Sequence, residues 1–164
     1  MKTLNQYIQE KLIINKDYND NAIVVKSFDE LRKIIEDRYD KLGAGTKRNP
    51  IDFNDIDVSN LDSFCGDNDK GIFEKTKFKY IDISSWDVSN IKSMRSMFYW
   101  CKELKSVGDI SEWDVSNVTS MTSMFDGCIL FNQDLSKWNV LNVTDAINMF
   151  YNCTIKKEYK PKFK

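Results

Sequence analysis

The chain reads Trp113-Asp114-Val115-Ser116-Asn117 near its centre, and this motif recurs on both sides. Related copies are Trp86-Asp87-Val88-Ser89-Asn90, Trp138-Asn139-Val140-Leu141-Asn142 and, without the tryptophan, Asp57-Val58-Ser59-Asn60. Each copy leads to a phenylalanine, and these follow at spacings of 25, 27 and 25 residues: Phe73, Phe98, Phe125 and Phe150. A fixed period of this length is typical of repeat proteins, in which each unit buries its apolar face only by stacking on its neighbours.

Within one repeat the spacing of the apolar residues changes. Leu135, Trp138 and Val140 come three and then two residues apart, which is close to the core of a leucine-rich repeat. Trp138 and Val140 alternate as the inward residues of a short strand do. Residues 143–150 then place apolar side chains three and four apart, which indicates a helical turn on the return side. We therefore predict about four coils, with short parallel strands centred near the valine of each motif.

The first part of the chain is not repetitive and reads as a cap. Thr3 and Gln6 fit a capping box at the start of a helical pattern, and residues 22–25 form a short strand candidate. A second capping box at Ser27 opens an amphipathic helix over residues 28–42, which Gly43 ends. This α-β-α unit is expected to cover the open apolar end of the repeats.

Three domains are therefore expected along the chain. They are an N-terminal cap module over residues 1–50, the repeats over residues 51–155, and a basic C-terminal tail over residues 156–164. The tail interleaves lysines with aromatic residues, so it is either a frayed soluble end or a contact for nucleic acid or an acidic protein.

Composition narrows the functional classes. The 164 residues are 41% hydrophobic and carry a net charge of −1, so no global field recruits nucleic acid or an anionic membrane. No stretch approaches the roughly 18 apolar residues of a membrane span, and the first residues do not resemble a signal peptide. We expect a cytoplasmic protein with no membrane partner.

Histidine is absent, which excludes catalytic sites that depend on an imidazole. Of the four cysteines, three follow their phenylalanine at one repeat position: Cys101, Cys128 and Cys153. Equivalent positions on stacked helical turns lie about 10 Å apart, too far for a disulfide. Buried free thiols are therefore expected. We predict no enzymatic activity, no cofactor, no metal and no small-molecule substrate.

The repeats resemble the short-repeat subgroup of the BspA-like leucine-rich-repeat proteins of bacterial surfaces. The residues that carry the likeness are 131–140, Phe-Asn-Gln-Asp-Leu-Ser-Lys-Trp-Asn-Val, and 113–125, from Trp113 to Met124-Phe125. The resemblance implies an α/β fold: a right-handed leucine-rich-repeat-like solenoid with short parallel strands, here with the N-terminal α-β-α cap. It also implies a role in interaction rather than catalysis. The overall layout is similar to small proteins carried by phages of gut bacteria.

The repeat frame assigns each row of side chains a role. The Trp, Met and Phe rows face inward as core, and the Asn row caps backbone groups or, alternatively, binds a ligand. The Asp row between Trp and Val faces outward as solvated surface, an acidic stripe for a basic partner, or a calcium site. The candidate partner-binding residues on this outward face are Ser85, Asp87, Ser89, Glu112, Asp114, Ser116, Lys137, Asn139 and Leu141.

These observations predict a non-enzymatic protein–protein interaction module that binds a protein partner of unknown identity through this face. Two alternatives remain open at this point. One is a surface or adhesion module of a bacterial repeat protein. The other is a phage-encoded inhibitor of a host defence enzyme, which would act in the host cytoplasm. Nucleic acid is a possible partner only through the basic tail.

Overall fold

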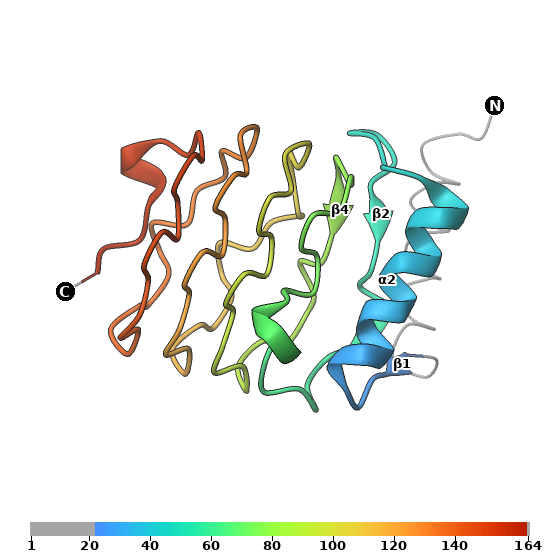
Figure 1. Ribbon diagram of the computed structural model, residues 1–164, viewed down its shortest axis with the longest axis horizontal. Helices are drawn as coiled ribbons and strands as arrows, with labels where there is room; N and C mark the ends of the chain where they lie inside the picture. The colour runs from blue at the N-terminus through green and yellow to red at the C-terminus, as the bar shows by residue number, and fades with distance from the viewer. Residues whose placement is uncertain (1–21, 164) are drawn as a thin grey trace, which may run out of the picture.

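The computed structural model describes residues 22–163, and the statements below concern these residues. Figure 1 shows successive segments of the chain side by side, with helix α2 lying along one end of the row. The elements are β1 (Ile23–Val24), α2 (Phe28–Leu42), β2 (Ile51–Asp52), β3 (Ile56–Asp57), the 3₁₀ helix η1 (Asp67–Asp69), β4 (Ile81–Asp82) and the 3₁₀ helix η2 (Lys157–Tyr159). We refer to residues 52–81, 82–108, 109–133 and 134–155 as coils 1 to 4.

Helix α2 begins and ends where the sequence predicts. Ser27 caps its N-terminus by accepting a hydrogen bond from the Glu30 N–H at 3.2 Å. At the other end Gly43 adopts a φ of 74°, and its N–H donates to the Tyr39 carbonyl at 2.8 Å. The strand predicted for residues 22–25 is present but shorter, as β1 over Ile23–Val24. The helix predicted from Thr3 onward lies outside the described residues.

On the return side of each coil, which we call the turn side, backbone hydrogen bonds join one coil to the next. The Phe98 N–H donates to the Met124 carbonyl, and the Phe125 N–H to the Met149 carbonyl, both at 2.9 Å. Parallel bridges connect the same side, namely Ser63 with Ser93, Ser93 with Ser120 and Ser120 with Asp145. The turn side is therefore held together by a ladder that crosses all four coils.

Aromatic rings stack through the interior in the same order. The centroids of Phe73 and Phe98 lie 5.4 Å apart, those of Phe98 and Phe125 5.2 Å, and those of Phe125 and Phe150 5.8 Å, with nearly parallel planes. The tryptophans of the repeated motif are also buried: Trp86, Trp113 and Trp138. Trp86 stacks on Phe73, with the ring centroids 6.0 Å apart. Both rows were predicted to face inward, and both predictions are confirmed.

The predicted fold class is wrong. We expected an α/β right-handed leucine-rich-repeat-like solenoid with short parallel strands, but residues 22–163 contain one α-helix and two small two-stranded parallel sheets, which are not closed. These sheets pair β1 with β3 and β2 with β4. No strand forms around Val88, Val115 or Val140, and the expected helices of the turn side are turns.

The reason for the missing strands lies in the short polar side chains of the motif. The carboxylate of Asp114 accepts a hydrogen bond from the N–H of Ser116, two residues on, and this local bond bends the chain where a strand would continue. On the turn side, Ser96, Ser123 and Asn148 adopt φ values of 55° to 57°. Left-handed residues at this position of coils 2, 3 and 4 interrupt a right-handed helix.

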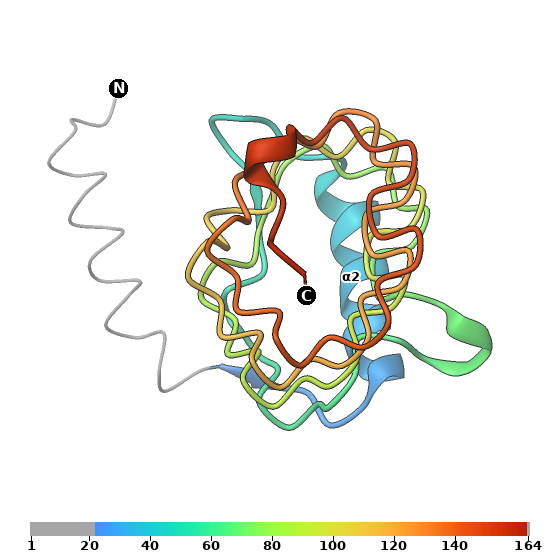
Figure 2. The same ribbon diagram turned by 90° about the vertical axis from the view of Figure 1, so that its left-hand side faces the viewer.

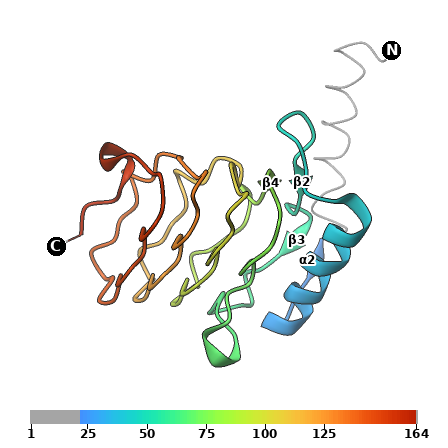
Figure 3. The same ribbon diagram turned by 45° about the horizontal axis from the view of Figure 1, so that its top comes forward.

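The polar insertion of coil 1, residues 66–71, forms a loop that stands out from the row of coils in Figures 2 and 3. It carries η1, and an antiparallel bridge between Cys65 and Gly71 closes its base. Arg95 of coil 2 ties the loop to the body through an ion pair with Asp69 at 3.0 Å.

All four cysteines are free thiols. Cys101 and Cys128 are buried as expected, and their Sγ atoms donate to the carbonyls of Phe73 and Phe98 at 2.9 and 3.0 Å. Cys153 was also expected to be buried, but it is half-buried, because no further coil among the described residues covers it.

Candidate functional site

The structure brings the candidate residues together on one face. We call this surface the outward loop face: Ser85, Asp87, Ser89, Glu112, Asp114, Ser116, Lys137, Asn139 and Leu141. Ser89 and Ser116 are half-buried, and the other seven side chains are exposed. The buried tryptophans and valines alternate with them, so coils 2, 3 and 4 present equivalent residues side by side.

The Asp row of this face holds its own backbone turns. Asp87 accepts from the Ser89 N–H and Asp114 from the Ser116 N–H, each at 3.0 Å. Asn139 occupies the same position in coil 4 and accepts from the Leu141 N–H at 3.4 Å. These acidic side chains are therefore part of the framework as well as part of the surface.

The same bonds set the protonation of the row. Hydrogen bonds from the Ser116 hydroxyl and then its N–H lower the pKa of Asp114. The Ser89 hydroxyl and N–H likewise lower the pKa of Asp87, although the neighbouring charge of Asp114 acts in the opposite direction. Both groups are thus negatively charged at neutral pH and keep their turns intact.

The Asn row joins neighbouring coils beside this face. The Nδ2 groups of Asn90, Asn117 and Asn142 donate to the carbonyls of the preceding coil, those of Ser59, Ser89 and Ser116, at 3.0, 2.8 and 2.7 Å. The interpretation of the row as backbone caps is confirmed. Each of these side-chain amides uses one N–H in a bond to the preceding coil, and these bonds fix the distance between coils on this side.

Nine carboxylates and one lysine lie in the segments that form this side of the molecule, residues 51–60, 81–90, 108–117 and 134–142. The lysine, Lys137, forms an ion pair with Glu112 of the preceding coil at 2.5 Å. Both side chains are well exposed, so the pair adds little to stability. The outward loop face itself has three carboxylates, Asp87, Glu112 and Asp114, and one lysine, so it is acidic even though the whole chain is nearly neutral.

A small hollow opens beside Lys137. It has a volume of about 290 Å³ and is lined by residues of coils 3 and 4: Asp109, Ile110, Ser111, Gln133, Asp134 and Lys137. The Gln133 side chain bridges the insertion that separates coils 2 and 3, because it accepts from the Val107 N–H at 2.9 Å and donates to the Gly108 carbonyl at 2.7 Å.

Sequence reasoning missed Trp100, which lies on the turn side. Its side chain is 41% exposed, and the Lys102 ammonium lies 4.1 Å from the ring centroid. Gly127 leaves room for the indole, since a Cβ there would lie 3.1 Å from the Trp100 Cδ1. With Ile129 and Thr154 these residues line a groove of about 510 Å³. The available signal was simple: the chain has four tryptophans and the motif explains three.

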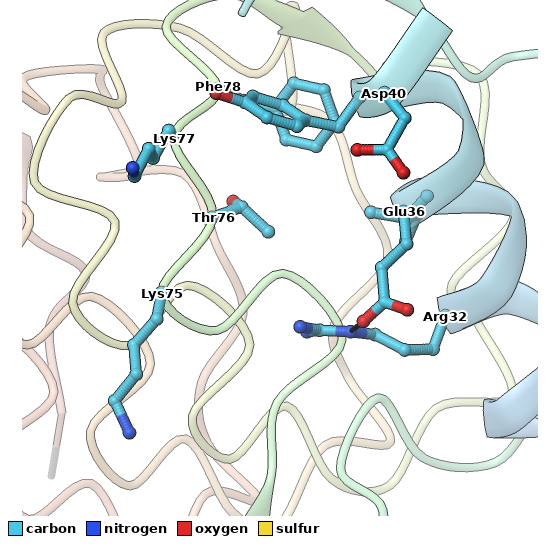
Figure 4. Close-up of a pocket in the computed structure, with 9 residues that line it drawn as sticks. Arg32, Glu36, Asp40, Lys75, Thr76, Lys77 and Phe78 are labelled. Atoms are coloured by element: carbon cyan, nitrogen blue, oxygen red, sulfur yellow. Dashed lines mark hydrogen bonds and ion pairs between the residues drawn. The ribbon is translucent and has the colours of Figure 1, made fainter. Parts of the chain in front are cut away.

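A third hollow, of about 400 Å³, separates α2 from residues 75–78 of coil 1. Figure 4 shows Glu36 and Asp40 on the helix wall, and Lys75 and Lys77 on the coil wall. Arg32 lies at one end, paired with Glu36 at 2.7 Å. Its guanidinium also donates to the carbonyls of Gly71 and Ile72 at 3.1 and 2.9 Å. Arg32 thus joins the helix to the first coil.

The C-terminal segment folds back over coil 4, as the view onto that end in Figure 2 shows. The Leu135 N–H donates to the Tyr159 carbonyl at 2.8 Å, and Ile155 and Pro161 are buried. Residues 155–163 are therefore packed rather than frayed. A contact with nucleic acid through the tail lysines stays a prediction.

Two negative findings apply to residues 22–163. No group of three or more Cys, Asp or Glu side chains in that range is arranged to hold a metal ion. No helix there has the length and apolar character needed to cross a membrane.

Comparison with known proteins identifies the family of the chain but gives no activity for it. Neither a curated protein nor a solved structure matches the chain. A family model described as Mycoplasma protein of unknown function, DUF285, matches residues 67–160, which cover coils 2 to 4 and more than half of the chain. The coarse prediction of a bacterial repeat family is confirmed by this match. The chain belongs to the DUF285 family.

Proposed function

We propose that this chain is a non-enzymatic module that binds a protein partner through the outward loop face. The observation that carries the proposal is the regular presentation of outward side chains by coils 2, 3 and 4. Asp87 and Asp114 hold the turns within a coil, and Asn117 and Asn142 fix the neighbouring coils. A surface that is ordered before binding loses little conformational entropy when a partner docks.

The charge of the face indicates the chemistry of this partner. Hydrogen bonds keep the pKa of Asp87 and Asp114 low, and Lys137 is already paired with Glu112. An acidic surface of this kind favours a partner with a basic patch, because complementary charge steers association and suppresses other partners. The remaining polar groups, such as Ser85, would then form the hydrogen bonds that set the register.

A second candidate is a surface or adhesion module. The resemblance of the repeats to BspA-like surface proteins favours this candidate, and the DUF285 match supports the coarse family link. Binding through the same face would serve either role. The phage-encoded inhibitor and the cytoplasmic location stay predictions.

Site-directed photo-crosslinking tests the proposal. A photoreactive amino acid placed at Ser85 or at Asn139 should crosslink the same protein in the native host, because these positions lie on coils 2 and 4 of one face. The matched control position is Lys33, which is exposed on α2. Crosslinks from Lys33 alone, or different proteins from Ser85 and Asn139, would contradict the proposed face.

A further inference from the structure

Each coil offers the next coil a row of backbone donors at alternate positions of the turn side. In coil 3 the N–H groups of Ser123, Phe125 and Gly127 donate to the carbonyls of Ile147, Met149 and Tyr151, all at 2.9 Å. In coil 2 the equivalent donors are Ser96, Phe98 and Trp100, at 2.8 to 3.0 Å. The ladder therefore runs in one direction, from the donors of one coil to the acceptors of the coil that follows.

Coil 4 has the same donors, and among the described residues no further coil stacks on it. By repeat position they are the N–H groups of Asn148, Phe150 and Asn152, for which no hydrogen bond is found among the described residues. Asn148 and Asn152 are exposed and Phe150 is half-buried, so the edge is open to solvent. At the opposite end of the ladder, Arg32 of α2 donates to the Ile72 carbonyl, which by repeat position is a first acceptor, and to the neighbouring Gly71 carbonyl.

The surroundings of the open edge are apolar and basic apart from Asp145, whose carboxylate accepts from the Ile147 N–H at 3.2 Å. Ile147 is 67% exposed and Tyr151 61% exposed, and both lie in sequence between or beside the three donors. The Lys160 ammonium lies 5.2 Å from the ring centroid of Phe150, the last ring of the aromatic stack. Within residues 22–163 this ammonium has an aromatic ring as its partner and no carboxylate.

We propose that this edge binds an extended acidic peptide segment of a partner protein. Its backbone carbonyls accept hydrogen bonds from Asn148, Phe150 and Asn152, as the next coil would. Apolar side chains of the segment pack on Ile147 and Tyr151, and acidic ones meet Lys160. The site is distinct from the outward loop face, which carries the opposite charge, so the two surfaces select different partners.

A second copy of the chain fits this edge less well than a peptide does. To continue the ladder, the second copy would have to offer free turn-side acceptors at its first coil. There α2 covers the end, and Arg32 already donates to the Ile72 carbonyl, which is an acceptor position of the ladder. An extended segment binds without displacing α2 or Arg32 of a second copy, and it supplies carbonyls along its whole length.

Amide hydrogen exchange measured by NMR on the full chain tests the proposal. The probe is an end-blocked ten-residue peptide of alternating Glu and Val. In the free protein the amides of Asn148, Phe150 and Asn152 should exchange much faster than those of Ser123, Phe125 and Gly127. Saturation with the probe should slow the first three at least tenfold and leave the second three unchanged.

The charge requirement has two matched controls. A peptide of alternating Lys and Val should bind at least fivefold more weakly, and Lys160→Gln should weaken the Glu-Val peptide at least threefold, whereas Lys33→Gln on α2 should not. Equal affinity for both peptides, binding without slower exchange at the three amides, or no binding at millimolar peptide would each overturn the proposal. Protection that rises with protein concentration alone would identify a second copy as the occupant and overturn it too.

Discussion

The indole Nε1 of Trp138 donates to the backbone carbonyl of Ile110, one coil earlier, at 2.8 Å. Trp86 makes the equivalent bond to Phe53 at 2.8 Å, but the buried Nε1 of Trp113 has no acceptor among the described residues. Trp113 belongs to the coil that follows the two-residue insertion Val107-Gly108. The row of indole hydrogen bonds is thus interrupted in the coil that follows the insertion, and the unsatisfied buried donor there is unfavourable.

This difference predicts that two tryptophan-to-phenylalanine substitutions have unequal effects on stability. Trp138→Phe should lower the free energy of unfolding by about 1 kcal/mol more than Trp113→Phe, because only the first substitution removes a hydrogen bond. Trp113→Ala should cost about 3–5 kcal/mol, because the side chain is 7% exposed and stacks on Trp138. Urea unfolding of the three variants measures these values. Equal costs for the two Phe variants would show that the orphaned donor has no energetic consequence.

Two substitutions of Asp114 should separate the effect of its hydrogen bond on stability from the effect of its charge. Asp114→Ala loses the acceptor of the Ser116 N–H and should lower stability by about 1 kcal/mol. Asp114→Asn should cost much less, because Asn139 already makes the same kind of bond in coil 4. Thermal unfolding of both variants checks this prediction. An Ala variant as stable as the Asn variant would show that the hydrogen bond from the Ser116 N–H does not stabilise the turn.

The same hydrogen bonds predict a dependence of stability on pH. They lower the pKa of Asp87, Asp109, Asp114 and Asp134 in the folded chain. A lowered folded pKa gives stability that is present above the unfolded value, about 4, and is lost as the pH falls through the folded value. The urea midpoint should thus fall between pH 5 and about pH 2. A variant with all four residues changed to Asn should show a smaller fall of the urea midpoint over this pH range. An equally large fall would show that other groups cause the pH dependence.

The thiols should fall into two classes. Burial raises the pKa of Cys101 to about 11 and also raises that of Cys128, so few thiolates form at these sites at pH 8. Cys65 and Cys153 are half-buried and should react first with a thiol reagent. Mass spectrometry of partly labelled folded protein should show Cys65 and Cys153 modified and Cys101 and Cys128 unmodified. Four thiols should react after unfolding without reductant, and labelling of Cys101 as fast as Cys65 would contradict the burial.

The parts of the structure that depend on apolar periodicity were predictable from the sequence. Residues 28–42 have a capping serine, a helical pattern and a terminal glycine, and all three act locally. The inward positions of Trp113 and Phe125 follow from their recurrence, because equivalent residues of a repeat occupy equivalent environments. The outward position of Asp114 follows from its place between two buried residues.

The backbone between those positions was not predictable in the same way. The pattern around Val115 fits a strand, but the hydrogen bond from Ser116 to Asp114 competes with strand formation. Ser96 and Trp100 adopt left-handed φ values of 56° and 58°, which residue type alone does not indicate. The exposed position of Trp100 was not predicted for a related reason. Its contact with Gly127 exists only because neighbouring coils stack.

The affinity of the crosslinked partner for a charge variant tests the central claim most directly. Asp87→Asn with Asp114→Asn removes two charges from the outward loop face and keeps both turn acceptors. The matched control, Asp67→Asn with Asp40→Asn, removes two exposed carboxylates that lie on the projecting loop of coil 1 and on α2, outside that face. Isothermal titration calorimetry should show at least tenfold weaker binding for the face variant, about 1.4 kcal/mol, and unchanged binding for the control. Unchanged affinity in the face variant, with its melting temperature preserved, would contradict binding through this face.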